Sequence, residues 1–372
     1  MAKGCKKNLY LDGKMIEPLD VSKPSTVKEF VDNVFGASGY NARRLSEACE
    51  IYTRMLKEKT TVSMTLAGAM TPIGMSGPII DLMKKGFLDF IVSTGANIYH
   101  DLHRAFNFPV VQGSQNADDY VLNKHGVARI YDTYIGDDET LLPTDRIILE
   151  AVLDHKFDKP VSTAKLHRLI GESVLKKAPF PEKSFLAQSV KYGVPVFTSS
   201  PGDSSIAMNM IIPHFHDKNI LLDPIMDIIE MTAIVREAEK NGVIIIGGGS
   251  PKNFYLQTQP TLWQILQDNI GGHDFFIQLT TDSPHWGGLS GATPQEAKSW
   301  GKVKGMPVNQ TVVYSCASLT FPIIAKYVIE SSKQRKPKRL LDELDEKAAR
   351  LKERALKNPK YKKVFSNIIK SK

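Results

Sequence analysis

The chain has 372 residues, of which 42% are hydrophobic and 24% are charged, values typical of a globular protein with a sizeable core. Its net charge of +8 is unevenly placed: residues 333–372 hold 15 lysines and arginines against 5 acids, a net charge of +10, and the other 332 residues hold 33 against 35, a net charge of −2. No apolar run approaches the length that spans a bilayer, so we expect no membrane insertion.

Short apolar segments alternate with helix-like segments along the body of the chain, and each is closely followed by small residues. The apolar segments predict strands at Thr61–Leu66, Leu88–Val92, Pro195–Thr198, Val243–Ile246, Phe275–Leu279 and Thr311–Tyr314. The segments between them predict helices that include Asn41–Lys57, Pro78–Lys85, Thr163–Lys177, Pro224–Asn241 and Leu319–Ser331. This alternation predicts an α/β fold, a parallel sheet with helices on both faces, and no linker divides it into two domains.

The basic tail, residues 333–372, is predicted to follow a single large domain, residues 1–332. It predicts a helix from Arg339 to Lys357, terminated by Asn358-Pro359, with one apolar face made by Leu340, Leu344, Leu351 and Ala355. Such a tail could bind nucleic acid or an acidic partner. Its few aromatic residues are a poor set for stacking bases, so we expect no nucleic-acid binding and a helix that docks on the body or on a sister subunit.

Small and polar residues follow five of the predicted strands, where an α/β sheet binds ligands. These segments are Ala67–Pro72, Ser93–Asn97, Ser199–Ser205, Gly247–Ser250 and Thr280–Ser283. Small residues let backbone amides approach phosphates, and an acid can hold ribose hydroxyls. Ordinary loops have the same composition and neither common phosphate fingerprint is present, but five such loops in one sheet favour a nucleotide cofactor.

The segment Ser299-Trp300-Gly301-Lys302 has two interpretations. A lysine after a glycine-rich turn is usually solvated. A lysine held against an aromatic side chain loses its proton more easily and can attack a carbonyl or imine carbon. The tetrapeptide alone leaves both open.

Histidines and cysteines predict neither a metal site nor a disulfide framework. His100 with His103, and His214 with His216, have no matching acids or cysteines nearby. The three cysteines, Cys5, Cys49 and Cys316, are far apart, which fits a reducing compartment and predicts a cytoplasmic location.

Four motifs together resemble the deoxyhypusine synthase family. They lie in order between about Ser63 and Tyr327, and comprise Gly202-Asp203-Ser204-Ser205, Gly247-Gly248-Gly249 with Lys252, Gln295 to Lys302, and Tyr314 to Pro322. The resemblance implies a Rossmann-like fold, a homotetramer, and NAD as cofactor. It also implies transfer of a 4-aminobutyl group from a polyamine such as spermidine, through an imine on an enzyme lysine, to an acceptor amine.

The resemblance assigns roles to particular residues. Lys302 is the implied nucleophile, Trp300 a wall of the substrate channel, and Glu296 the partner of an ammonium group. The positions implied to contact NAD are Thr94, Gly95, Asp203, Ser204, Gly248, Thr281, Asp282 and Ala317. The acceptor is a protein lysine in one branch of the family and putrescine in another; a third alternative is a relative that binds NAD without turnover.

This sequence departs from the family pattern at several substrate positions. The family's catalytic histidine falls at Asn253, which cannot accept a proton at neutral pH, although both Asn253 and His100 remain at substrate-binding positions. Family carboxylates fall at Met208, Leu289 and His100. His285 and His100 are the candidate replacements for the lost base, and we favour His285 because a short turn separates it from Lys302.

Overall fold

The computed structural model describes residues 14–23, 25–218 and 220–370. For residues 366–370 it describes the backbone but not the side chains. Cys5 lies outside the described residues. At its centre is a six-stranded sheet in the order β6-β2-β1-β7-β8-β9, in which all neighbours are parallel. The strands are β1 (Thr61–Leu66), β2 (Phe90–Ser93), β6 (Val196–Thr198), β7 (Asn241–Ile246), β8 (Phe275–Thr280) and β9 (Gln310–Tyr314).

The sheet confirms the predicted α/β fold. The sequence places β1 residue for residue and the other five strands within a few residues of their ends. The predicted helix Pro224–Asn241 is too long, because α11 ends at Glu237 and Asn241 already begins β7. The side-chain amide of Asn241 donates to the carbonyl of Val235 at 3.0 Å, which closes the turn between the two elements.

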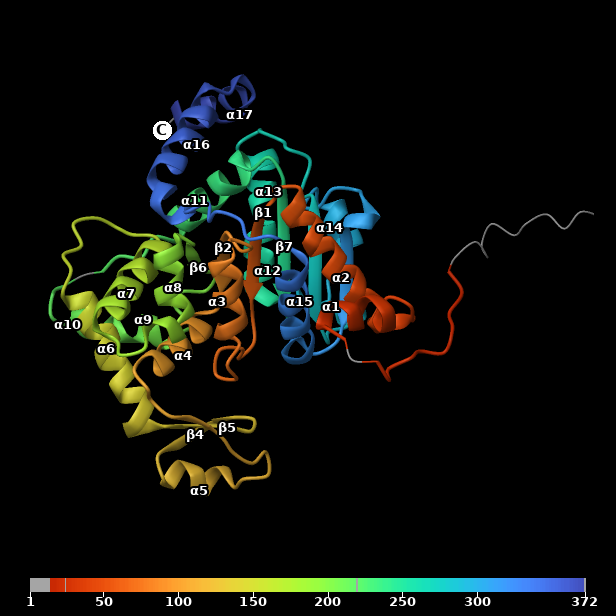
Figure 1. Ribbon diagram of the computed structural model, residues 1–372. Helices are drawn as coiled ribbons and strands as arrows, with labels where there is room; N and C mark the ends of the chain where they lie inside the picture. The colour runs from red at the N-terminus through yellow and green to blue at the C-terminus, as the bar shows by residue number, and fades with distance from the viewer. Residues whose placement is uncertain (1–13, 24, 219, 371–372) are drawn as a thin grey trace, which may run out of the picture.

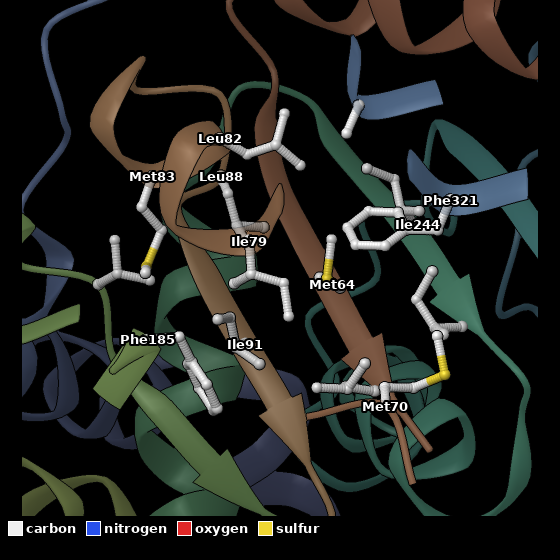
Figure 2. Close-up of a cluster of buried hydrophobic side chains, with 14 of the residues drawn as sticks. Met64, Met70, Ile79, Leu82, Met83, Leu88, Ile91, Phe185, Ile244 and Phe321 are labelled. Carbon is white, nitrogen blue, oxygen red and sulfur yellow. The ribbon is translucent and has the colours of Figure 1, made fainter. Parts of the chain in front are cut away.

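Alternate residues along each strand belong to two hydrophobic clusters, one on each face of the sheet. On β7, Ile244 and Ile246 lie in the first cluster, and Val243 and Ile245 in the second. Figure 2 shows part of the first cluster, in which Met64 and Ile91 meet side chains of the covering helices. Helices contributing to the first cluster include α2 (Tyr40–Lys57), α3 (Ser76–Lys84), α7 (Thr163–Lys177), α8 (Phe185–Tyr192) and α15 (Ala317–Ser331).

The second cluster receives two or more residues from each of three α-helices. They are α11 (Pro224–Glu237), α12 (Gly249–Leu256) and α16 (Leu344–Lys357). Apart from α5, described below, the remaining α-helices are α1 (Val27–Phe30), α4 (Gly95–Ala105), α6 (Leu142–Leu153), α9 (Ser205–Asn209), α10 (Ile211–Phe215), α13 (Thr258–Pro260), α14 (Pro294–Ser299) and α17 (Pro359–Lys370).

A second, antiparallel sheet was not predicted from the sequence. It has the order β3-β5-β4, formed by β3 (Val110–Gln112), β4 (Val127–Ile130) and β5 (Thr133–Gly136), and α5 (Asp119–Lys124) lies between its strands in the chain. The sheet and α5 project from the body beyond α4 and α6 (Figure 1). Only Thr133 and Ile135 of its strands are buried, so the apolar pattern that marks a core strand is weak.

The basic tail packs on the body. A single turn of 3-10 helix, Leu340–Glu343, leads into α16, which lies alongside α11 (Figure 1). Leu340, Leu344 and Leu351 are buried in the second cluster, as their predicted stripe requires. The predicted end of this helix is confirmed, because α16 ends at Lys357. Pro359 then begins α17, which was not predicted, at a position that proline favours.

Candidate functional site

Lys302 lies in the turn that follows α14, close to the amino end of β8, where Val303 forms a parallel bridge with His273. Thr293 caps α14 by accepting from the amide of Glu296 at 3.2 Å, and Pro294 occupies the first turn. The amide of Lys302 donates to the carbonyl of Ala297, and its own carbonyl accepts from His273. Backbone hydrogen bonds on both sides therefore fix where the side chain of Lys302 begins.

The ammonium group of Lys302 lies among three groups that the sequence had singled out. Its Nζ donates to Oδ1 of Asn253 at 3.0 Å and lies 5.6 Å from the centre of the Trp300 ring, within cation–π distance. Burial lowers the pKa of Lys302, and the charge of Glu296 opposes that shift. Trp300 is itself 59% exposed, so its ring shields Lys302 from water less than the other residues around the lysine do.

A cavity of about 280 Å³ opens beside Lys302. It is lined by Lys252, Asn253, Leu256, Gln257, Leu289, Ala292, Thr293, Glu296, Ala297, Trp300 and Lys302. The structure thus brings together Lys302, Trp300, Glu296 and Asn253 from the sequence-derived set. A cavity with one half-buried lysine and one carboxylate can hold an amine and present a carbon to a nitrogen nucleophile.

Lys252 is a second lysine in the lining of this cavity, and unlike Lys302 it is fully buried. From the sequence it could be recognised only as part of a motif. It is 2% exposed, and its Nζ donates to Oε1 of Gln278 and to the carbonyls of Leu289 and Ala292 at 3.0, 3.0 and 2.6 Å. Burial lowers the pKa of Lys252 to about 8, and the nearby charge of Lys302 adds to that shift. A buried lysine cannot be recognised in sequence, since its partners lie 26 to 40 residues away.

The two candidate bases lie elsewhere in the chain's fold. His285 is exposed in the loop after β8, where its Nδ1 is 2.7 Å from Oγ of Ser283 and its ring packs on Trp286 at 4.3 Å. His100 is on α4, with Nδ1 2.9 Å from Nε2 of His103. Among the described residues that line the Lys302 cavity, neither histidine appears.

Burial controls the titration of the α4 histidines. It lowers the pKa of His100 to about 4 and that of His103 to about 3, with Arg104 adding to both shifts. His103 also contacts Oγ1 of Thr144 at 2.8 Å. Both rings are therefore neutral near pH 7, and His100 is a weak base in this chain.

The positions expected to contact NAD lie in the loops at the carboxyl edge of the sheet. Gly247 and Gly249 adopt φ of +74° and +59° after β7, values that favour glycine. A Cβ on Gly95 would lie 2.2 Å from Cβ of Ser204, and one on Gly248 would lie 2.5 Å from Cα of Ser290. These close approaches pack the β2 loop against the β6 loop and the β7 loop against the turn at Ser290, so a larger residue at Gly95 or Gly248 would clash.

Other contacts join these loops across the edge. Oγ of Ser200 lies 3.2 Å from Oγ of Ser250, linking the β6 loop to the β7 loop. Asp203 and Thr281 are exposed there, and Asp282 is half-buried, so their oxygens are available to ribose hydroxyls. Thr94 accepts from the side-chain amide of Asn97 at 3.0 Å, and Ala317 begins α15 beyond β9.

Within the described part of the chain, no three His, Cys, Asp or Glu side chains are grouped as a metal site would require. No described helix is both long enough and apolar enough to cross a bilayer.

Comparison with known proteins gives a consistent result. The deoxyhypusine synthase family model matches residues 30–328. A "deoxyhypusine synthase-like protein" of Nostoc sp. is 42% identical over 344 residues, covering 90% of this chain and 89% of the relative. A "probable deoxyhypusine synthase 2" of Methanosarcina acetivorans is 37% identical over 316 residues, covering 85% and 90%.

A solved structure supports the fold independently. The crystal structure of a candidate deoxyhypusine synthase from Entamoeba histolytica superimposes with a TM-score of 0.57 at 17% sequence identity, covering 86% of this chain and 99% of the other. At that identity the likeness bears on the fold alone.

Proposed function

Because the chain belongs to the deoxyhypusine synthase family, a family of transferases, we propose that it moves a 4-aminobutyl group from a polyamine donor to an acceptor amine, with Lys302 as covalent nucleophile and NAD as cofactor. The observation that carries the proposal is the position of Lys302. Its amine lies in a cavity beside Asn253 and Glu296, with a pKa lowered by burial.

Each of four residues in the cavity has a separate role in the proposed reaction. A lowered pKa gives Lys302 a larger fraction of the neutral amine, which alone can attack a carbon. Asn253 accepts a hydrogen bond from Lys302 and so orients its nitrogen. Glu296 offers a carboxylate to the free ammonium of the donor, and the exposed face of Trp300 offers a cation–π contact.

NAD would be held by Thr94, Gly95, Asp203, Ser204, Gly248, Thr281, Asp282 and Ala317. When bound, it would supply reversible hydride transfer at the carbon beside the donor amine. The close approach of Gly95 to Ser204 supports this assignment, since it brings the loop that carries Thr94 against the loop that carries Asp203.

Acid–base chemistry is assigned to His285, with His100 as the alternative. His285 is favoured because its loop also contains Leu289, which lines the cavity of Lys302. If His285 is the base, the pH–rate profile of His285→Gln loses its acid limb and that of His100→Gln keeps it. Wild-type profiles in both variants would leave proton transfer to the substrate amine or to water.

The acceptor separates the alternatives within this proposal: it is a protein lysine, or a small amine such as putrescine. A third alternative, NAD binding without turnover, conflicts with the intact Lys302, Trp300 and Glu296 of the cavity. A homotetramer and a cytoplasmic location stay predictions, of which sedimentation would check the first.

Trapping tests the proposal directly. The protein is incubated with NAD and a panel of polyamines, reduced with borohydride, digested and analysed by mass spectrometry. We expect a four-carbon adduct on the peptide that contains Lys302, lost in Lys302→Ala and kept in Lys298→Ala, since Lys298 lies outside the cavity lining. An adduct on another lysine, with Lys302→Ala still active, would refute the assignment.

A further inference from the structure

A second cavity, of about 380 Å³, adjoins the cavity of Lys302. The two share Asn253, Gln257 and Leu289 in their walls. The other residues that line the second cavity come from α11 and from the segment that runs from α12 to Thr261. A molecule held at Lys302 can therefore extend past the shared residues toward α11.

The described lining of the second cavity is mostly polar and carries no charge. Six of its ten residues have a hydroxyl or a side-chain amide, and these are Thr232, Ser250, Asn253, Gln257, Thr258 and Thr261. The other four are apolar, and none of the ten is ionisable. The lining of the Lys302 cavity, in contrast, includes two lysines and one glutamate. The two cavities therefore suit chemically different ends of one molecule.

Two side chains of the second cavity have hydrogen-bonding capacity that the described part of the chain does not use. Thr232 is fully buried on α11, and its Oγ1 has no hydrogen-bond partner among the described residues. Asn253 accepts from Lys302 through Oδ1, which leaves its Nδ2 as a donor without a partner among these residues. Because threonine has two favoured χ1 rotamers in a helix, its hydroxyl can turn toward a ligand. A hydroxyl or carboxamide, which both donates and accepts, matches this pair.

A second ammonium group fits this cavity poorly, and Lys252 shows why. Its Nζ has three uncharged acceptors at 2.6 to 3.0 Å, yet burial still lowers the pKa of Lys252 to about 8. Uncharged acceptors therefore do not replace the hydration that a buried ammonium loses. The second cavity offers only such acceptors among its described lining residues, so a ligand end without charge enters it at lower cost.

We propose that the second cavity binds the far end of the acceptor, and that this acceptor is a small monoamine whose far end is an uncharged hydroxyl or carboxamide. The inference rests on the proposed function, because it takes Lys302 to carry the group being transferred. The acceptor amine would lie near Lys302 and Glu296, and its far end would bond to Thr232 and Asn253. Putrescine, which ends in a second ammonium, would be the poorer acceptor.

The transfer step balances without an added oxidant or reductant. The neutral acceptor nitrogen adds to the carbon of the protonated imine, forming a new carbon–nitrogen bond. The bond from that carbon to Nζ of Lys302 then breaks, and the proton lost by the acceptor nitrogen ends on the released lysine amine. One protonated imine is exchanged for another, and the oxidation level of the carbon is unchanged.

Calorimetry with three amines tests the site without turnover or cofactor. The probes are 4-aminobutan-1-ol, putrescine and butylamine, which share a four-carbon chain and a primary amine and end in a hydroxyl, an ammonium and a methyl group. We expect the amino alcohol to bind about fivefold more tightly than butylamine, as one uncharged hydrogen bond provides, and more tightly than putrescine. The six-carbon analogues are measured too, so that reach does not decide the result. Tighter binding of the methyl or ammonium probe at both lengths would overturn the inference.

Two threonine variants locate the hydroxyl contact. Thr232→Val keeps the shape of the side chain and leaves no group in the described chain without a partner, since Oγ1 of Thr232 has none. It should abolish the preference for the hydroxyl over the methyl probe. Thr65→Val on β1 is the control, because Thr65 is also fully buried with an unpartnered Oγ1 and lies outside both linings. A preference that survives in Thr232→Val would contradict the proposed contact.

A charge placed in the shared wall tests the exclusion of a second ammonium. Gln257 is exposed and lines both cavities, so Gln257→Glu adds a carboxylate there without burying it. We expect putrescine to become the tighter binder over the amino alcohol. Gln264→Glu, exposed and outside both linings, should keep the wild-type order. An unchanged order in Gln257→Glu would overturn the argument from charge.

A separate assay distinguishes these failures from failure of the proposed function. Acetaldehyde forms an imine with a reactive lysine, and cyanoborohydride traps it. Labelling of Lys302 in the wild type and in Thr232→Val, with no preference for the amino alcohol in the wild type, would refute only the acceptor site. A preference for the amino alcohol without labelling of Lys302 would refute the nucleophile, and the acceptor role would fall with it.

Discussion

At the scale of single residues, the site depends on the balance of charge around Lys302. Burial lowers the pKa of Lys302 and Glu296 raises it. Glu296→Gln removes the opposing contribution, so the pKa of Lys302 should fall further. Imine formation with acetaldehyde rises with pH as Lys302 loses its proton, and we expect the midpoint of that rise to move to lower pH in Glu296→Gln.

The control for this prediction is an acid far from the cavity. Glu172 pairs with Arg168 on α7 at 2.8 Å, so Glu172→Gln should leave the midpoint unchanged. A shift to higher pH in Glu296→Gln would mean that the carboxylate does not act on Lys302 through its charge.

The buried Lys252 gives a prediction about stability. Lys252→Met leaves Oε1 of Gln278 and the carbonyls of Leu289 and Ala292 without their donor, and unsatisfied acceptors in a buried site are costly. We expect the free energy of unfolding to fall by about 2–4 kcal/mol. Urea denaturation measures it, and Lys298→Met serves as the half-buried control, with a change within about 0.5 kcal/mol. Equal stability of the two variants would show that the 289–292 turn does not need this anchor.

At the scale of elements, the strand-end loops form one surface only if their close approaches are kept. Gly95→Ala places a Cβ 2.2 Å from that of Ser204, which should push the β6 loop and Asp203 out of place. We expect NAD affinity, measured by calorimetry, to fall about tenfold, or about 1.4 kcal/mol.

Gly77→Ala on α3 is the matched control, because nothing lies within 4 Å of a Cβ there. Unchanged affinity in Gly95→Ala would place the cofactor away from the β2 and β6 loops. Absence of NAD binding by the wild-type protein would count against the cofactor assignment as a whole.

The elements also show what the sequence could and could not predict. Six core strands were predictable because each is a buried apolar segment with small residues after it, and β1 is recovered residue for residue. The strands β3, β4 and β5 were missed because they are short and mostly outside the core. Lys302, Trp300, Glu296 and Asn253 could be named from motifs, whereas the burial of Lys252 depends on the packing of distant segments.

At the scale of the whole molecule, the basic tail completes the core of the body. Its buried leucines share the second cluster with strand residues Phe90 and Val243. Polar contacts reinforce this packing: Lys347 pairs with Glu237 at 2.7 Å and Arg354 with Asp268 at 2.6 Å. Part of the positive charge of the tail is therefore paired with acidic residues of the body.

Two truncations separate the tail's structural part from its end. Deleting residues 333–372 removes the buried Leu340, Leu341, Leu344 and Leu351, each of which contributes about 1.5–3 kcal/mol. That sum is comparable with the whole net stability of a typical domain, about 5–15 kcal/mol, so we expect the protein that lacks residues 333–372 not to fold stably.

Deleting residues 359–372 removes none of these leucines, and the described side chains of 359–365 are half-buried or exposed. This shorter form should melt within a few degrees of the full chain, by the rule that about 1 kcal/mol shifts the midpoint of a large domain by roughly 2–4 °C. Thermal unfolding followed by circular dichroism makes the comparison. A stable, folded protein lacking 333–372 that has lost salt-dependent RNA binding shown by the full chain would instead make the tail a nucleic-acid arm.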